Sequence, residues 1–155
     1  MKNYLNDSSI ASFLLSQENK YSHRVSHSIR LNRQWINYTY HEVIQSTFCF
    51  SKTIQLQGIN PGERVLIISR NRPEFCIAFF ACALMGVVAV PVDPQMSIKD
   101  LQLIFEHSHS SGILILDKVD ENLAKEILKE ASNKAMLRAE FIPRASAKNE
   151  KHEVH

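Results

Sequence analysis

The chain has 155 residues, of which 45% are hydrophobic and 22% are charged, enough apolar material for one domain with its own core. This composition excludes an intrinsically disordered chain. The formal net charge of +2 is too small to predict binding to nucleic acid or to an anionic membrane.

Cysteine usage favours a reduced, cytoplasmic protein. The three cysteines, Cys49, Cys76 and Cys82, are odd in number, form no CxxC pair and lie among apolar neighbours. We interpret them as buried thiols. The first residues lack the continuous apolar segment of a secretory signal, so we expect a cytoplasmic location.

A helix and a β-hairpin come first in the chain. Ser8 or Ser9 can cap the helix. The segments "RVSHSIRL" and "QWINYTY" are separated by Asn32 and Arg33 and predict two antiparallel strands. The apolar face of the helix is expected to consist of Ile10, Phe13 and Leu14.

A second helix is predicted to begin at Thr39. Thr39 and Glu42 have the capping-box spacing, in which each side chain accepts the other residue's backbone N–H. Gly58 is the expected left-handed residue at its end. The apolar positions of this helix are Val43, Phe48, Phe50 and Ile54.

From residue 64 onward, short apolar strands alternate with helices. Strands are predicted at 64–69, 87–92 and 112–117, and helices at 72–85, after a cap formed by Ser97 and Asp100, and around Leu123 to Leu128. Strands that are apolar on both faces and alternate with helices predict an α/β fold in which helices cover a parallel sheet.

The uncharged segment 75–92 approaches the length of a membrane span. Gly86 divides it: helix-forming Phe, Ala, Leu and Met precede the glycine, whereas Val87, Val88 and Val90 follow it. A helix of about twelve residues is only ~18 Å long, which is too short for ~30 Å of hydrocarbon. The pattern therefore predicts a buried helix followed by a buried strand.

Hydrophobic periodicity fades after about Ser132. The final residues, "IPRASAKNEKHEVH", are polar and basic. We expect an α/β unit over residues 1–132 and a mobile tail over residues 133–155.

One cluster of polar residues follows the first predicted sheet strand. Asn71, Pro73 and Glu74 are helix-start signals and need no ligand to explain them. Arg70 and Arg72 remain, at the carboxyl end of a parallel strand, where α/β sheets bind ligands. A phosphate-binding role is one interpretation, and surface arginines beside a helix cap are the favoured one.

The glycines argue against common nucleotide-binding motifs. The chain has four, Gly58, Gly62, Gly86 and Gly112, and neither GxGxxG nor GxxxxGK[ST] can be written. A dinucleotide-binding loop and a P-loop are therefore excluded.

The histidines do not predict a metal site. His23 and His27 have helical i, i+4 spacing but lie in or beside a predicted strand, and His107 and His109 share one side of an extended piece without a carboxylate or thiolate. Ser108, Ser110 and Ser111 lack a nucleophile elbow. The remaining histidines are His41, His152 and His155.

Three segments together resemble a known family. "WINYTYHEV", "LQGINPGERVLIISRNRPEFCIAFFACALMGVVAVPVDP" and "LQLIFEHSHSSGILI" are similar, in order and spacing, to the start of the adenylate-forming (AMP-binding) superfamily. The resemblance covers residues 35–117, and the superfamily includes acyl-CoA synthetases and fatty acyl-AMP ligases. It implies the N-terminal α/β subdomain of such an enzyme, preceded by a helix and a hairpin.

The resemblance also implies a two-step reaction. A carboxylate reacts with ATP and magnesium to give an acyl-adenylate and pyrophosphate, and a thiol of coenzyme A or of a carrier protein then takes the acyl group. The family's Ser/Thr/Gly-rich loop, Thr-Glu pair, ribose-binding Asp and C-terminal lysine have no counterpart in this sequence. We therefore expect no catalytic, cofactor-binding or metal-binding residue of the family in this chain.

Three functions remain open. The first is an N-terminal fragment of an acyl-CoA synthetase-like ligase of fatty acid metabolism, from a truncated gene and inactive alone. The second is a non-catalytic interaction module, or a split half that completes a site with the missing remainder of the ligase on another chain. The third is an unrelated, flavodoxin-like binding domain. Uncovered sheet edges would favour self-association, and we expect neither nucleic acid as a partner nor a transmembrane segment.

Overall fold

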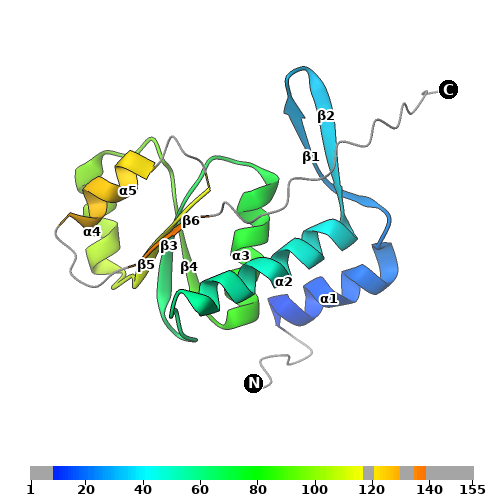
Figure 1. Ribbon diagram of the computed structural model, residues 1–155, viewed down its shortest axis with the longest axis horizontal. Coiled ribbons are helices and arrows are strands. Elements are labelled where there is room, and N and C mark those ends of the chain that lie inside the picture. Colours follow the sequence, from blue (N-terminus) through cyan, green and yellow to red (C-terminus); the bar gives the residue numbers. More distant parts are fainter. Residues whose placement is uncertain (1–8, 117–120, 130–134, 139–155) are drawn as a thin grey trace.

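The computed structural model describes residues 9–116, 121–129 and 135–138. Its elements follow the order α1 (Ile10–Tyr21), β1 (Val25–Leu31), β2 (Gln34–Thr39), α2 (Tyr40–Leu56), β3 (Arg64–Ile68), α3 (Pro73–Met85), β4 (Val88–Val92), α4 (Ile98–His107), β5 (Gly112–Ile115), α5 (Glu121–Leu128) and β6 (Ala135–Arg138). The predicted α/β class and the leading helix and hairpin are confirmed (Figure 1).

A parallel sheet forms the centre of the fold. Its strand order is β4-β3-β5-β6, and all three strand pairs are parallel. Strand β6 was not predicted, and it lies within the range 133–155 expected to be a tail. Its residues, "AMLR", are good helix formers, so only pairing with β5 across the sheet makes them a strand. The other residues expected in the tail lie outside the described part of the chain.

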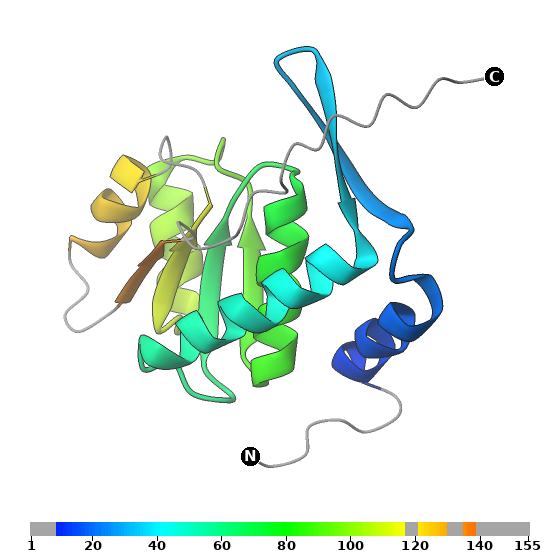
Figure 2. The ribbon, with the colours of Figure 1, turned by 45° about the vertical axis from the view of Figure 1, so that its right-hand side comes forward.

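Helices cover the two faces of the sheet with separate apolar clusters. Val65 and Ile67 of β3 point toward α2 and α3, whereas Leu66 and Ile68 point toward α4 and α5. This alternation is the pleat of a strand that is buried on both faces. Figure 2 shows α2 and α3 on one side of the sheet and α4 with α5 on the other.

Helix α1 packs differently from the prediction. Ser9 caps it by accepting the N–H of Ser12 at 3.0 Å, as expected for one of the two candidate caps. Ala11 and Leu14 are its buried residues, whereas Ile10 and Phe13 are exposed. The predicted apolar face was therefore wrong at two of three positions, because α1 contacts α2 and α3 through a side one residue further around the helix.

The predicted hairpin is confirmed and projects beyond the sheet and its helices (Figures 1 and 2). Asn32 and Arg33 form its two-residue turn, with φ angles of 49° and 66°. Two consecutive positive φ angles are the geometry that suits the right-handed twist of the flanking strands.

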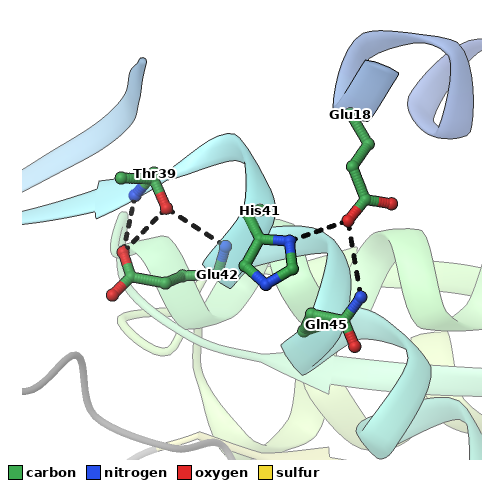
Figure 3. A network of polar contacts seen from close by, with 5 residues as sticks. All are labelled: Glu18, Thr39, His41, Glu42 and Gln45. Carbon is green, nitrogen blue, oxygen red and sulfur yellow. Dashed lines mark hydrogen bonds and ion pairs between the residues drawn. The ribbon is translucent and has the colours of Figure 1, made fainter. Parts of the chain in front are cut away.

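The start of α2 holds the hairpin, α1 and α2 together (Figure 3). Thr39 and Glu42 form the predicted capping box, with the Thr39 N–H donating to Glu42 Oε2 at 2.8 Å. Glu18 of α1 accepts from His41 Nδ1 at 2.9 Å and from Gln45 Nε2 at 3.4 Å.

The rest of α2 largely follows the prediction. Val43, Phe50 and Ile54 are buried as predicted, but Phe48 is exposed. The helix ends at Leu56, and Gly58 follows with a φ of +80°.

The uncharged segment is a helix followed by a strand, as predicted. Helix α3 ends at Gly86, whose φ of +66° is the left-handed conformation of a helix end. Strand β4 then begins at Val88. None of the helices in the described ranges combines the length and the apolar character that a membrane span requires.

Candidate functional site

The carboxyl edge of the parallel sheet is the candidate site, because open α/β sheets bind their ligands there. Three loops meet this edge. Residues 69–72 follow β3, residues 93–97 follow β4, and Leu116 follows β5.

Arg72 is the central side chain of the first loop. Its Nε and Nη2 donate to the two carboxylate oxygens of Glu74 at 2.9 and 3.0 Å. Its Nη1 donates to the carbonyl oxygen of Leu116 at 3.2 Å. The guanidinium therefore ties the start of α3 to the end of β5, which lies 44 residues away in the sequence.

This arrangement corrects the sequence interpretation of the helix start. Arg72, not Asn71, is the N-cap residue of α3, and no side chain caps the helix. Pro73 occupies the first turn as expected. Arg72 is a partly buried structural side chain, so the favoured interpretation as a surface arginine was wrong at this position and holds only for Arg70, which is exposed.

The second loop uses its polar groups for turns and caps. Asp93 Oδ1 accepts the N–H of Gln95 at 2.8 Å, and Ser97 accepts the N–H of Asp100 at 3.2 Å. The cap predicted at Ser97 is confirmed. These groups already serve the fold locally, as Asx turns and helix caps do.

The described loops at this edge do not have the features of a triphosphate cradle. Such a cradle needs flexible backbone whose N–H groups converge on the ligand. The loop after β3 contains no glycine. At the opposite, amino edge, Gly62 and Gly86 each lie two positions before a strand, and Gly112 begins β5. The N–H of Gly62 donates there to the carbonyl of Gly86 at 2.8 Å, which ties two strand-leading turns together.

Glu63 organises that amino edge. Its carboxylate accepts the backbone N–H of Asn60 and, at 2.8 Å, the hydroxyl of Ser111. These hydrogen bonds stabilise the charged form and hold the pKa of Glu63 below its usual value. Ser110 is buried and shares a 2.7 Å hydrogen bond with Ser108. The serines of this segment therefore fix a turn.

The histidines are dispersed over the structure. His107 is the last residue of α4, and His109 follows in a turn with a φ of 51°, so the expectation that both lie on an extended piece was wrong. His27 lies half-buried in β1, where burial lowers its pKa. His152 and His155 lie outside the described residues. Within the described ranges, no group of three or more His, Cys, Asp or Glu side chains is placed to hold a metal ion.

The three cysteines are unpaired but differ in burial. Cys82 is fully buried in α3, where burial raises its pKa to about 12. Cys76 is half-buried and its pKa is also raised by burial. Cys49 is exposed on α2, so the expectation of three buried thiols was wrong for this residue.

The model of the AMP-binding enzyme family matches residues 16–154, so the chain belongs to this family. The family resemblance inferred from the sequence is therefore confirmed, and an unrelated flavodoxin-like domain is set aside. The match also spans both the described sheet and its preceding hairpin.

Relatives of the chain include CoA ligases. The chain is 30% identical over 105 residues to 4-hydroxybutyrate–CoA ligase 2 of Metallosphaera sedula, covering 68% of this chain and 18% of that protein. It is 29% identical over 84 residues to long chain acyl-CoA synthetase 2 of Arabidopsis thaliana, covering 54% of this chain and 12% of that protein. The chain thus spans less than a fifth of the length of these relatives.

Solved structures show the same fold. A benzoate CoA ligase from Burkholderia xenovorans superposes with a TM-score of 0.74 at 17% identity, covering 84% of this chain and 26% of that one. A fatty acid AMP ligase from Legionella pneumophila superposes with a TM-score of 0.67 at 21% identity, covering 79% and 22%. The described α/β fold is therefore the one found in part of these adenylate-forming enzymes.

Proposed function

We propose that the chain is the N-terminal portion of an acyl-CoA synthetase-like ligase that activates a carboxylic acid with ATP and magnesium. The family match over residues 16–154 carries this proposal. In it, the 155 residues supply scaffold, and polypeptide beyond them supplies the groups that bind triphosphate and stabilise the adenylation transition state. These 155 residues alone are then inactive.

The geometry of the carboxyl edge supports the scaffold role. Arg72 is engaged by Glu74 and Leu116, and the polar groups of Asp93 and Ser97 serve local turns. Acid activation depends on positioned charges around the transferring phosphate. The loops described at this edge hold the sheet and its helices in place. In this proposal, these elements position the charged groups that the rest of the ligase supplies.

We further propose a substrate of the fatty acid type and a cytoplasmic location. Relatives named as long-chain acyl-CoA synthetases and a neighbour named as a fatty acid AMP ligase support the substrate class. Three unpaired cysteines support a reducing compartment.

The partner in this proposal is the remainder of the ligase, whether it continues in the same polypeptide or is a separate chain. Two surfaces support it. The first is α3, which leaves Phe79 and Phe80 half-buried, and the second is the edge strand β4, where Val88 is 47% exposed. Burying exposed apolar side chains of this kind against another part of a protein lowers the free energy.

Self-association is the competing use of the second surface, the β4 edge. The N–H of Val88 donates to Glu63 on the β3 side, so by strand alternation the backbone of Ala89 and Pro91 faces the open side. Pro91 has no N–H to donate to an added strand. The β4 edge therefore disfavours the addition of a regular strand from a second copy. Packing of the remainder of the ligase against the apolar side chains is the better-supported arrangement.

Pyrophosphate release tests the proposal. The reading frame that follows residue 155 in the genome is expressed with the chain and on its own, and each preparation receives ATP, magnesium and a fatty acid. We expect acid-dependent pyrophosphate release only when both parts are present. Activity of the 155-residue chain alone, lost in the variant Arg72→Met made and purified identically, would overturn the inactive-scaffold proposal.

A second outcome concerns the partner. If the frame beyond residue 155 encodes no segment that completes the fold, we expect the chain to capture a separate ligase polypeptide whose activity it restores. The variant Phe80→Asp, on the half-buried side of α3, should then weaken capture, whereas Leu103→Asp on the exposed side of α4 should not. Equal capture by both variants would contradict the assignment of this surface.

A further inference from the structure

Positive charge is concentrated in the segment that runs from the end of α1 through the hairpin. Between Glu18 and Glu42 the sequence contains no acidic residue, whereas Lys20, Arg24, Arg30 and Arg33 lie in this interval. The chain as a whole has a net charge of only +2, so the remaining residues are net acidic. The small whole-chain charge therefore conceals a basic segment. Its Arg30 and Arg33 lie in the projecting hairpin, whereas Lys20 lies near the end of α1 and Arg24 directly precedes β1.

The two faces of the hairpin differ. On the inner face, Ile29 pairs with Ile36, and both pack against the apolar cluster that also contains Tyr38. On the outer face, Arg30 pairs directly with Trp35 across the strands. Packing of the inner face holds the hairpin against the rest of the chain. This packing does not explain why a tryptophan occupies the outer face.

The end of the hairpin combines apolar and cationic groups. Trp35 on the outer face is 66% exposed, and Leu31, which by strand alternation lies on the opposite face, is 45% exposed at the same end of the hairpin. Arg30 and Arg33 are exposed as well. No described carboxylate forms an ion pair with either arginine. Figures 1 and 2 show this end extending past the helices and the sheet. A flat surface that approaches the molecule from this side therefore contacts the end of the hairpin before the rest of the described chain.

We propose that the end of this hairpin binds an anionic phospholipid surface. Trp35 and Leu31 enter the headgroup region, where a tryptophan keeps its ring in apolar surroundings and its N–H in water. Arg30 and Arg33 lie at the level of the anionic headgroups and contribute charge attraction. The result is weak, reversible interfacial binding, distinct from a membrane span.

An acidic protein is the other class of partner for such a surface. A stable protein–protein interface buries about 800 Å² on each partner, spread over roughly 20–30 residues. The exposed end of the hairpin offers four large side chains on a narrow projection. Interfacial insertion needs only a few aromatic and aliphatic side chains with neighbouring cations, so the lipid surface fits better. This inference does not depend on the proposed ligase function.

Trp35 provides the experiment, because it is the only tryptophan in the chain. The purified chain is titrated with vesicles of phosphatidylcholine containing phosphatidylserine, and separately with vesicles of phosphatidylcholine alone. We expect a blue shift and protection from acrylamide quenching with the anionic vesicles, reversed by added salt. An unchanged spectrum, or an equal response to both kinds of vesicle, overturns the proposal.

Variants assign the effect to the hairpin end. Arg30→Thr and Arg33→Asn suit a strand and a positive φ respectively, and together they should weaken vesicle binding at least about fivefold. The matched control is Lys99→Ser with Leu103→Ser, an exposed cation and an exposed leucine on α4, which should bind as the parent does. Equal losses in both double variants contradict the assignment.

Two further readouts keep the result unambiguous. Far-UV circular dichroism checks that each variant is folded, and vesicles with brominated lipids test insertion in the unaltered chain, because bromine quenches a tryptophan that enters the bilayer interface. Poly-glutamate stands in for an acidic protein surface. A fluorescence response to poly-glutamate without any response to anionic vesicles would overturn lipid binding in favour of a protein partner.

Discussion

Removing the guanidinium of Arg72 tests the main structural contact of the candidate site. In Arg72→Met the carboxylate of Glu74, whose residue is 8% exposed, loses a bidentate partner, and the carbonyl of Leu116 loses a donor. An unpaired buried charge costs about 3–5 kcal/mol. The side chains of Arg72 and Glu74 are 21% and 11% exposed, so water reduces part of this cost. With about 1 kcal/mol for the lost hydrogen bond, we expect a loss of about 3 kcal/mol.

Urea unfolding followed by circular dichroism measures this loss. The matched control is Arg70→Met, an exposed arginine two residues earlier, which should change stability by less than about 0.5 kcal/mol. The double variant Arg72→Met with Glu74→Met removes both charges and should recover most of the loss. If Arg72→Met and Arg70→Met unfold at the same urea concentration, the reasoning about this contact is refuted.

Three further predictions concern other parts of the fold. Thr39→Ala removes the capping box of α2 and should cost about 1 kcal/mol in urea unfolding, and a loss below a few tenths would contradict the capping argument. Hydrogen bonds hold the pKa of Glu63 below its usual value of 4.5, so its contribution is present above pH 4.5 and disappears as the pH falls through the folded-state pKa. Glu63→Gln should therefore destabilise the chain by less than about 1 kcal/mol at pH 7, with the difference vanishing in acid, and a constant difference would disprove it. Cys49 should react with a thiol reagent in the folded chain, whereas Cys82, with a pKa of about 12, should react only after urea unfolding; simultaneous modification would show that α3 opens readily.

Local signals allowed much of the fold to be predicted. The spacing of Thr39 and Glu42 predicted a capping box, and Asn32 with Arg33 predicted a two-residue turn, because each feature depends on residues within a few positions of one another. The change in residue type at Gly86 likewise separated a helix from a strand. Short stretches of sequence are therefore sufficient to predict such features.

Other features depend on distant partners and were missed. Arg72 looked like a surface residue because its acceptor on Leu116 is 44 residues away. Strand β6 was missed because its residues favour a helix and only the neighbouring β5 makes them a strand. The exposed Phe48 occupies an apolar position of α2 that no neighbouring element covers in the described structure. In each case tertiary packing, which a local pattern does not contain, decides the outcome.

The candidate site illustrates the same division. The sequence placed polar residues at the carboxyl end of β3, and the structure locates them there. It also separates their roles, because Arg72 is held by Glu74 and Leu116 whereas Arg70 faces solvent. Helix-start signals and ligand-binding signals use the same residue types, so the sequence alone left both interpretations open.

The most direct test of the account is ATP–pyrophosphate exchange by the purified 155-residue chain, measured with labelled pyrophosphate, magnesium and a panel of fatty acids. We predict no acid-dependent exchange above that of a buffer blank for the chain alone, and exchange once the remainder of the ligase is added. Acid-dependent exchange by the chain alone, abolished by a substitution at the carboxyl edge of its sheet, would show that these residues are more than a scaffold for chemistry supplied elsewhere.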